Sequence, residues 1–173
     1  GLAAEHGVDR HVVDAQDVAR VIDGIRRTSW PLRGVFHAAG VTGMANVLEL
    51  DVAALERVLA PKCQGAWNLH EACAGEELDH FIAYSSLAAV WGARSQAHYA
   101  AANAFLDGLS AHRRVRGEPA VSIQWGPWDS DGMGRPEQKR AFEALGIAGA
   151  DRGELFGNAL ERGQAEPHLE QRG

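Results

Sequence analysis

The sequence has few cysteines, no long hydrophobic run and no excess of basic residues. Its two cysteines, Cys63 and Cys73, form neither a Cys-x-x-Cys pair nor part of a histidine-rich cluster, so neither a disulfide framework nor a metal site is predicted. No apolar run approaches the ~20 residues that a membrane helix needs, and the first residues do not resemble a signal peptide. The sequence therefore predicts a protein of the reducing cytoplasm with no membrane partner.

The charge balance excludes a second class of partner. Lysine and arginine number 17 against 23 aspartates and glutamates, which gives a formal net charge of −6. Because a phosphate backbone is bound by clustered basic residues, a nucleic-acid partner is not expected. With 173 residues, 46% of them hydrophobic and 23% charged, the composition is that of a globular protein with a core.

Short apolar runs alternate with helical periodicities along the chain. The strands are expected near residues 9–13, 34–37, 80–84 and 120–124, and the helices near 17–28, 51–74, 95–115 and 137–145. The runs at 34–37 and 80–84 lack polar alternation, as is typical of parallel strands with helices on both faces. This pattern predicts the α/β class, with a Rossmann-like, doubly wound parallel sheet.

The first expected helix shows how this pattern arises. Val18, Val21, Ile22 and Ile25 recur at helical spacing and form one apolar stripe. Asp17 is placed to cap the N-terminus of this helix. We therefore expect one face of the helix to pack on the sheet.

A glycine-rich phosphate-binding turn is missing from these residues. A doubly wound nucleotide-binding domain should open with a strand and a Gly-x-Gly-x-x-Gly turn, and no such motif occurs. Residues 1–7 look like the end of a helix that leads into a strand. The sequence therefore predicts a domain over residues 1–149 that lacks its first βαβ portion, with a C-terminal end or linker over residues 150–173.

The densest group of polar residues follows the run at 80–84. Ser85 and Ser86 come at the end of this expected strand, and Tyr99 and Asn103 are spaced i, i+4 on one face of the next helix. A tyrosine, whose ordinary pKa is about 10, gives up its proton readily only beside a cation, and Lys62 is the natural candidate. The alternative is that Tyr99 and Asn103 are surface residues and Ser86 caps a turn.

The chain resembles the ketoreductase domain of modular type I polyketide synthases, an extended branch of the short-chain dehydrogenases/reductases. Ordinary members of that superfamily have Tyr-x-x-x-Lys, whereas this chain has Asn103 four residues after Tyr99 and its lysine upstream at Lys62. The exchanged arrangement is similar to that of the synthase ketoreductases and of animal fatty acid synthase. The resemblance spans about residues 1–149 and is carried by Gly34-Val35-Phe36-His37-Ala38-Ala39-Gly40-Val41, Pro61-Lys62, Ala83-Tyr84-Ser85-Ser86, His98-Tyr99-Ala100-Ala101-Ala102-Asn103-Ala104-Phe105-Leu106-Asp107 and Trp125-Gly126-Pro127-Trp128.

The resemblance implies a reaction and its partners. The family uses NADPH to reduce a β-ketoacyl thioester on an acyl carrier protein to a β-hydroxyacyl thioester, within a synthase of several domains. The resemblance makes Tyr99 the general acid and Ser86 a hydrogen-bond donor to the ketone oxygen. Lys62 would stabilise the phenolate and Asn103 would complete a proton relay. His37 and His98 are expected to be structural, although the family usually has asparagine where His98 stands.

Part of a cofactor site is also implied. Asp14 matches the aspartate near the adenine, and Ala38, Ala39 and Gly40 match the turn along the ribose. Gly126 and Pro127 match the loop near the nicotinamide amide. The phosphate turn and the basic residues that select NADPH over NADH belong to the missing portion, so this chain alone is expected to bind NADPH weakly and to be inactive.

Two features bear on stereochemistry. The family's domains that give D-alcohols have a Leu-Asp-Asp motif, which residues 41–44 lack, whereas Trp91 stands eight residues before Tyr99, as in A-type domains that give L-alcohols. Gln96 replaces the histidine of the subtype that epimerises an α-methyl group. The alternative for Trp91 is that it only packs under a lid, and the tryptophans at 125 and 128 are expected to pack in the core.

A different class of function remains open from the sequence. The chain could be a non-enzymatic remnant or scaffold fragment of a polyketide or fatty acid synthase that never binds cofactor. The intact set of Ser86, Tyr99, Asn103 and Lys62 argues against long decay. The missing glycine-rich turn argues for inactivity of this chain by itself.

Overall fold

The computed structural model describes residues 14–126 and Arg140. Of these, residues 14–125 belong to one compact unit, and Gly126 and Arg140 belong to a second. Several predictions lie outside the described residues. They are the strand at 9–13, the placement of Pro127 and Trp128, the division after residue 149 and, except for Arg140, the helix at 137–145.

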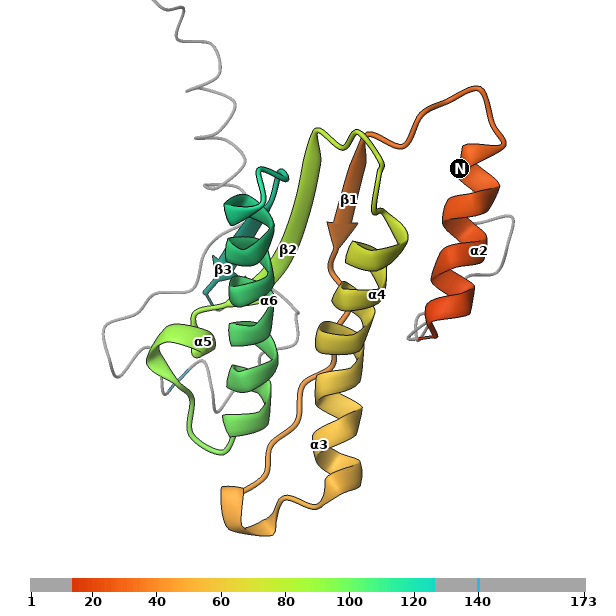
Figure 1. Cartoon of the computed structure of the whole chain (residues 1–173). Helices are drawn as coiled ribbons and strands as arrows, with labels where there is room; N and C mark the ends of the chain where they lie inside the picture. Colours follow the sequence, from red (N-terminus) through yellow and green to blue (C-terminus); the bar gives the residue numbers. More distant parts are fainter. Residues whose placement is uncertain (1–13, 127–139, 141–173) are drawn as a thin grey trace, which may run out of the picture. The chain divides into compact units, whose positions relative to one another are not determined.

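The described strands form one parallel sheet in the order β1-β2-β3 (Figure 1). They are β1 (Gly34–His37), β2 (His80–Ser86) and β3 (Val121–Trp125). Gly34 lies opposite His80, and Ser86 lies opposite Trp125. The parallel α/β arrangement predicted from the sequence is confirmed. Strand β2 is two residues longer than predicted, so Ser85 and Ser86 are its last residues instead of following it.

The helices connect these strands along the chain. They are α2 (Ala15–Arg26), the 3₁₀-helix η1 (Val47–Glu49), α3 (Val52–Leu59), the π-helix η2 (Ala60–Gln64), α4 (Gly65–Ala72), α5 (Ala88–Trp91) and α6 (Ala97–Val115). The single helix expected at 51–74 is thus divided by η2. Pro61 lacks the N–H that an α-helical turn would use, and the chain takes a wider turn there.

Helix α2 begins earlier than predicted. Its N-cap is Asp14 and not Asp17, because the Asp14 carboxylate accepts hydrogen bonds from the N–H groups of Gln16 at 2.6 Å and Asp17 at 3.4 Å. Asp17 lies in the first turn, where its negative charge interacts favourably with the positive end of the helix dipole. The apolar stripe is confirmed at Val18 and Ile22, which are buried, whereas Val21 is half-exposed at its edge.

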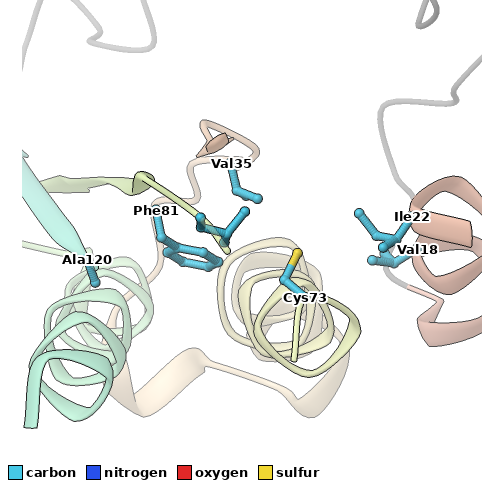
Figure 2. Packing of buried hydrophobic residues seen from close by; sticks show 7 residues of the cluster. Val18, Ile22, Val35, Cys73, Phe81 and Ala120 are labelled. Atoms are coloured by element: carbon cyan, nitrogen blue, oxygen red, sulfur yellow. The ribbon is translucent and has the colours of Figure 1, made fainter. Parts of the chain in front are cut away.

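The core lies between the sheet and the helices that cover one of its faces. Figure 2 shows Val18 and Ile22 pointing from α2 toward Cys73 at the end of α4, with Val35 and Phe81 from the sheet beyond. The whole cluster consists of Val18, Ile22, Val35, Cys73, Leu78, Phe81 and Ala120. A second cluster joins α4 and α6 to β2 and consists of Ala66, Ala83, Leu106 and Leu109.

The opposite face of the sheet differs from the sequence expectation. Burial alternates along β1: Val35 and His37 are buried, and Phe36 between them is 62% exposed. The predicted cover on both faces is therefore not complete among the residues that the structure describes. Within residues 14–126, no helix is both long enough and apolar enough to cross a bilayer.

Candidate active site

The site is built where β2 ends and α6 begins. In parallel sheets, functional residues gather at the carboxyl ends of the strands. Asn103 is fully buried, and its side-chain Nδ2 donates a hydrogen bond to the carbonyl of Tyr99 at 2.8 Å. Ser85 Oγ donates to the carbonyl of Asn103 at 3.2 Å. The end of β2 and the first turns of α6 are therefore tied together through Asn103.

Lys62 brings a buried cation to this junction. Its side chain leaves η2, is only 3% exposed, and donates from Nζ to the carbonyl of Tyr84 at 2.8 Å. The same Nζ lies 5.9 Å from the centroid of the Tyr99 ring. Burial lowers the pKa of Lys62 to about 8, against weaker opposing effects of Cys63 and Asp107. The ammonium is thus predominantly charged at pH 7 and lies beside the tyrosine.

Gly40 allows the turn after β1 to approach Lys62 closely. A Cβ at Gly40 would lie 3.3 Å from Lys62 Nζ and 2.8 Å from Lys62 Cε, and the second of these distances is shorter than real Cβ contacts. Residues 38–40, predicted to lie along a ribose, therefore end against the ammonium. Nζ has three protons and donates one of them to the carbonyl of Tyr84, so the others can donate hydrogen bonds to hydroxyl groups near the turn. This arrangement fits the ribose of a nicotinamide cofactor.

The hydroxyl of Ser86 already takes part in one local hydrogen bond. Its Oγ accepts from the N–H of Ala88 at 3.2 Å, which agrees with the alternative prediction that Ser86 caps a turn. Accepting this bond leaves the hydroxyl proton of Ser86 to donate elsewhere. The side chain is half-buried at the carboxyl end of β2. The two preceding residues of this strand, Tyr84 and Ser85, form hydrogen bonds with Lys62 and Asn103, respectively.

His37 is a buried neutral side chain beneath η2. It ends β1, and its Cε1 lies 3.5 Å from the position that a Cβ of Gly65 would take. Burial, and next the charge of Lys62, lower the pKa of His37 to about 4, although the carbonyls of Pro61 and Lys62 oppose this. At pH 7, His37 therefore adds no charge next to Lys62.

This histidine makes the stability of the chain depend on pH. The unfolded chain binds a proton at His37 near pH 6.5, and the folded chain binds one only near pH 4. The contribution of neutral His37 to the free energy of unfolding is thus fully present above pH 6.5 and is lost as the pH falls toward 4. Between pH 7.5 and 5, we expect the free energy of unfolding in urea to fall by about 2 kcal/mol on its account.

A matched pair of variants separates His37 from the other titrating groups. His37→Asn should remove most of this pH-dependent loss, whereas the same change at the exposed His80 should leave it intact. If His37→Asn loses as much stability as the parent over this range, the assignment to His37 is wrong.

The remaining predicted site residues are placed more loosely. Asp14 is exposed, and both of its capping hydrogen bonds end on Oδ1. Gly126 follows β3 directly and is the last residue before a gap in the described ranges. Trp91 ends α5 and is 61% exposed, so no described residue buries it. Gln96 is buried just before α6, where its carbonyl accepts from the N–H of Ala100 at 2.8 Å.

Two contributors to the site were not predicted from the sequence, the carbonyl of Tyr84, which holds Lys62, and the π-helical turn η2, which carries this lysine. The only signal for the turn was a proline inside a helical pattern. The ring of Tyr84 stacks on Trp125, with centroids 6.0 Å apart, which agrees with a packing role for this tryptophan. In the described part of the chain, no cluster of three or more histidines, cysteines or acidic residues is arranged to bind a metal.

Comparisons of the amino-acid sequence relate this chain to known proteins. The family described as "KR domain" matches residues 5–130. The chain is 39% identical over 136 residues to a phenolphthiocerol/phthiocerol polyketide synthase protein of Mycobacterium tuberculosis, covering 79% of this chain and 6% of that protein. It is 44% identical over 136 residues to the pikromycin polyketide synthase component PikAIII of Streptomyces venezuelae, covering 79% and 9%.

Solved structures agree with the fold. The chain is similar to PlmKR1, the ketoreductase from the first module of phoslactomycin biosynthesis in Streptomyces sp. HK803, with a TM-score of 0.78 and 36% identity over 88% of this chain and 35% of that one. It is equally similar to A-type ketoreductases from a modular polyketide synthase, with a TM-score of 0.78, 36% identity, and coverage of 88% and 32%. The chain thus spans about a third of these solved chains and less than a tenth of the two synthase proteins.

Proposed function

Because this chain belongs to the KR domain family of modular polyketide synthases, we propose that it forms the catalytic part of a ketoreductase in polyketide biosynthesis. The substrate is a β-ketoacyl thioester on the phosphopantetheine arm of an acyl carrier protein, and the product is the β-hydroxyacyl thioester. The observation that carries the proposal is that the buried ammonium of Lys62 lies beside the ring of Tyr99. Lys62 is held by a carbonyl of β2, and Tyr99 is held within α6 by Asn103. Other domains of the synthase are its further partners.

Two hydroxyl groups act on the ketone oxygen. Tyr99 donates its phenolic proton to that oxygen as it becomes an alcohol, and Ser86 donates a hydrogen bond to it. The carbonyl carbon would receive a hydride, which is the chemistry that bound NADPH would supply. Two donors aimed at an oxygen that gains negative charge lower the barrier, because they bind the transition state more strongly than the ketone.

Lys62 and Asn103 support the tyrosine in different ways. The ammonium of Lys62 stabilises the phenolate that remains after proton transfer, since a cation 5.9 Å from the ring centroid favours the anion. Asn103 holds the backbone of Tyr99 through Nδ2. Its Oδ1 is buried and has no hydrogen-bond partner among the described residues, so it is available to accept a proton-relay hydrogen bond.

The chain supplies only some of the groups that hold the cofactor. Ala38, Ala39 and Gly40, with Lys62, would hold the ribose next to the nicotinamide. Both capping hydrogen bonds of Asp14 end on Oδ1, so its Oδ2 would be left for the adenine end. By the family resemblance, Gly126 and Pro127 would belong to the loop that contacts the nicotinamide amide, and Pro127 lies outside the described residues. The 173 residues contain no glycine-rich phosphate turn. The reaction therefore requires a complete domain in which such a turn is present.

The stereochemistry of the product tests this proposal. Trp91 is 61% exposed at the end of α5, five residues after Ser86, where an indole can steer the pantetheine arm to one side. We expect the complete domain to be A-type, to give the L-configured alcohol and to leave an α-methyl group unepimerised beside Gln96. An energy difference of about 1.4 kcal/mol already gives tenfold selectivity.

Chiral chromatography of the β-hydroxy product, with NADPH consumption followed in parallel, measures this outcome. Trp91→Ala should lower the excess of the L-alcohol, and Trp67→Ala, which changes a partly exposed tryptophan on α4, should not. A product that is mainly the D-alcohol would refute the A-type assignment. A complete domain that neither binds NADPH nor reduces the thioester would instead support the scaffold alternative.

A further inference from the structure

The loop after β1 meets the start of α6 at a glycine. The imidazole of His98 is 2% exposed, and its Nε2 lies 2.5 Å from the position that a Cβ of Gly43 would take. Val58 Cγ2, from α3, lies 3.2 Å from the same position. Real Cβ atoms essentially never come within 3.0 Å of another heavy atom, so the histidine occupies the space that a side chain at residue 43 would need.

The same loop is held at a second point. The N–H of Ala45 donates a hydrogen bond to the carbonyl of Ser95 at 2.9 Å. Ser95 has a φ of 58°, a left-handed conformation that is uncommon outside glycine and that turns the chain into α6. Residues 41–45, hereafter the 41–45 loop, are therefore bound to the segment before α6 and to its first turn.

The 41–45 loop begins beside Lys62 and ends at Ser95, four residues before Tyr99. Gly40, which precedes the loop, packs on Lys62, and Lys62 Nζ lies beside the Tyr99 ring. The loop ends at Ala45, on the carbonyl of Ser95. Consecutive residues of a helix point in different directions, so His98 contacts the loop while the next residue, Tyr99, faces Lys62.

Burial of an imidazole at residue 98 has a cost that an apolar side chain would avoid. His98 Nδ1 is buried and has no hydrogen-bond partner among the residues that the structure describes. A buried polar atom without a partner lowers stability. The close approach of the ring to Gly43 accounts for the histidine better than hydrogen bonding does.

We propose that His98 is a positioning residue that seats the 41–45 loop against the start of α6, and that it thereby determines the side from which the ketone approaches Tyr99. This inference rests on the proposed reduction and deepens it, because the loop joins two parts of the proposed site, Lys62 and the start of the helix that carries Tyr99. The loop is seated by contact between the His98 ring and Gly43, and His98 takes no part in proton transfer.

Urea unfolding of the full chain tests the contact without reference to activity. Gly43→Ala should raise the unfolding equilibrium constant by about tenfold or more, because a methyl group is forced against the imidazole. In a His98→Ala background, the same change should raise it by less than about threefold. Gly108→Ala in α6 is the matched control, since no heavy atom lies within 4 Å of its added Cβ, and it should not destabilise either background.

The complete domain then reports the effect on specificity. His98→Ala should reduce the ratio of L- to D-alcohol by about tenfold and raise KM for the thioester more than it lowers kcat. A residue with only a structural role would reduce the amount of active enzyme and leave the product ratio unchanged.

Separate measurements distinguish the ways in which the inference can fail. Equal effects of Gly43→Ala with and without His98 would show that the ring does not seat the loop. Coupling in unfolding with an unchanged product ratio would overturn the role in specificity. A parent domain that reduces no thioester would refute the proposed reduction itself, and with it the specificity role, whereas the unfolding cycle would still report on the contact.

Discussion

Replacement of Tyr99 by phenylalanine should lower the rate of ketone reduction in the complete domain by about 10²-fold or more, the scale of removing a positioned general acid. Phenylalanine keeps the ring beside Lys62 and the backbone carbonyl that Asn103 holds, so folding should be unchanged. Only the donated proton is lost. Single-turnover consumption of NADPH with a β-ketoacyl thioester measures the rate, and fluorescence titration should show that cofactor affinity is retained.

The chain offers a matched control for this experiment in its other tyrosine. Tyr84 holds Lys62 through its backbone carbonyl, and its ring stacks on Trp125. Tyr84→Phe keeps both contacts and should reduce the thioester at nearly the parent rate. If Tyr99→Phe is also nearly as fast as the parent, Tyr99 is not the acid and the proposed mechanism is wrong.

Lys62→Met should produce the second large loss, about 10²-fold in the rate of reduction, because it removes the cation that stabilises the phenolate. The pH dependence should change as well. Burial places the pKa of Lys62 at about 8, so activity that depends on the ammonium falls as the pH rises through that value. This fall should be present in the parent and absent from Lys62→Met.

Stability separates the loss of chemistry from the loss of folding. The ammonium is buried and donates a hydrogen bond to the carbonyl of Tyr84, and methionine fills a similar volume without a charge to desolvate. Lys62→Met should therefore be at least as stable as the parent in urea, and Lys139→Met, at the only other lysine, should change neither rate nor pH profile. A Lys62→Met variant that keeps the parent pH profile would show that this lysine does not control the tyrosine.

Local patterns explain why much of the architecture could be predicted. Strand β1 has the predicted bounds, and α6 begins within two residues of its predicted start, because apolar runs and helical spacing are properties of neighbouring residues. Parallel pairing followed from the lack of polar alternation in the strands. The cap of α2 was placed wrongly because Asp14 and Asp17 are both suitable capping residues, and only the backbone conformation selects Asp14.

The amino-acid sequence by itself determined the family of this protein, the order of its strands and helices along the chain, and the identity of Ser86, Tyr99, Lys62 and Asn103 as the candidate site. Only the tertiary structure decided how these side chains are held. The π-helical turn that carries Lys62 to the carbonyl of Tyr84, and the seat of His98 on Gly43, join residues far apart in the chain. Such contacts depend on how whole elements pack, and no spacing along the sequence encodes them.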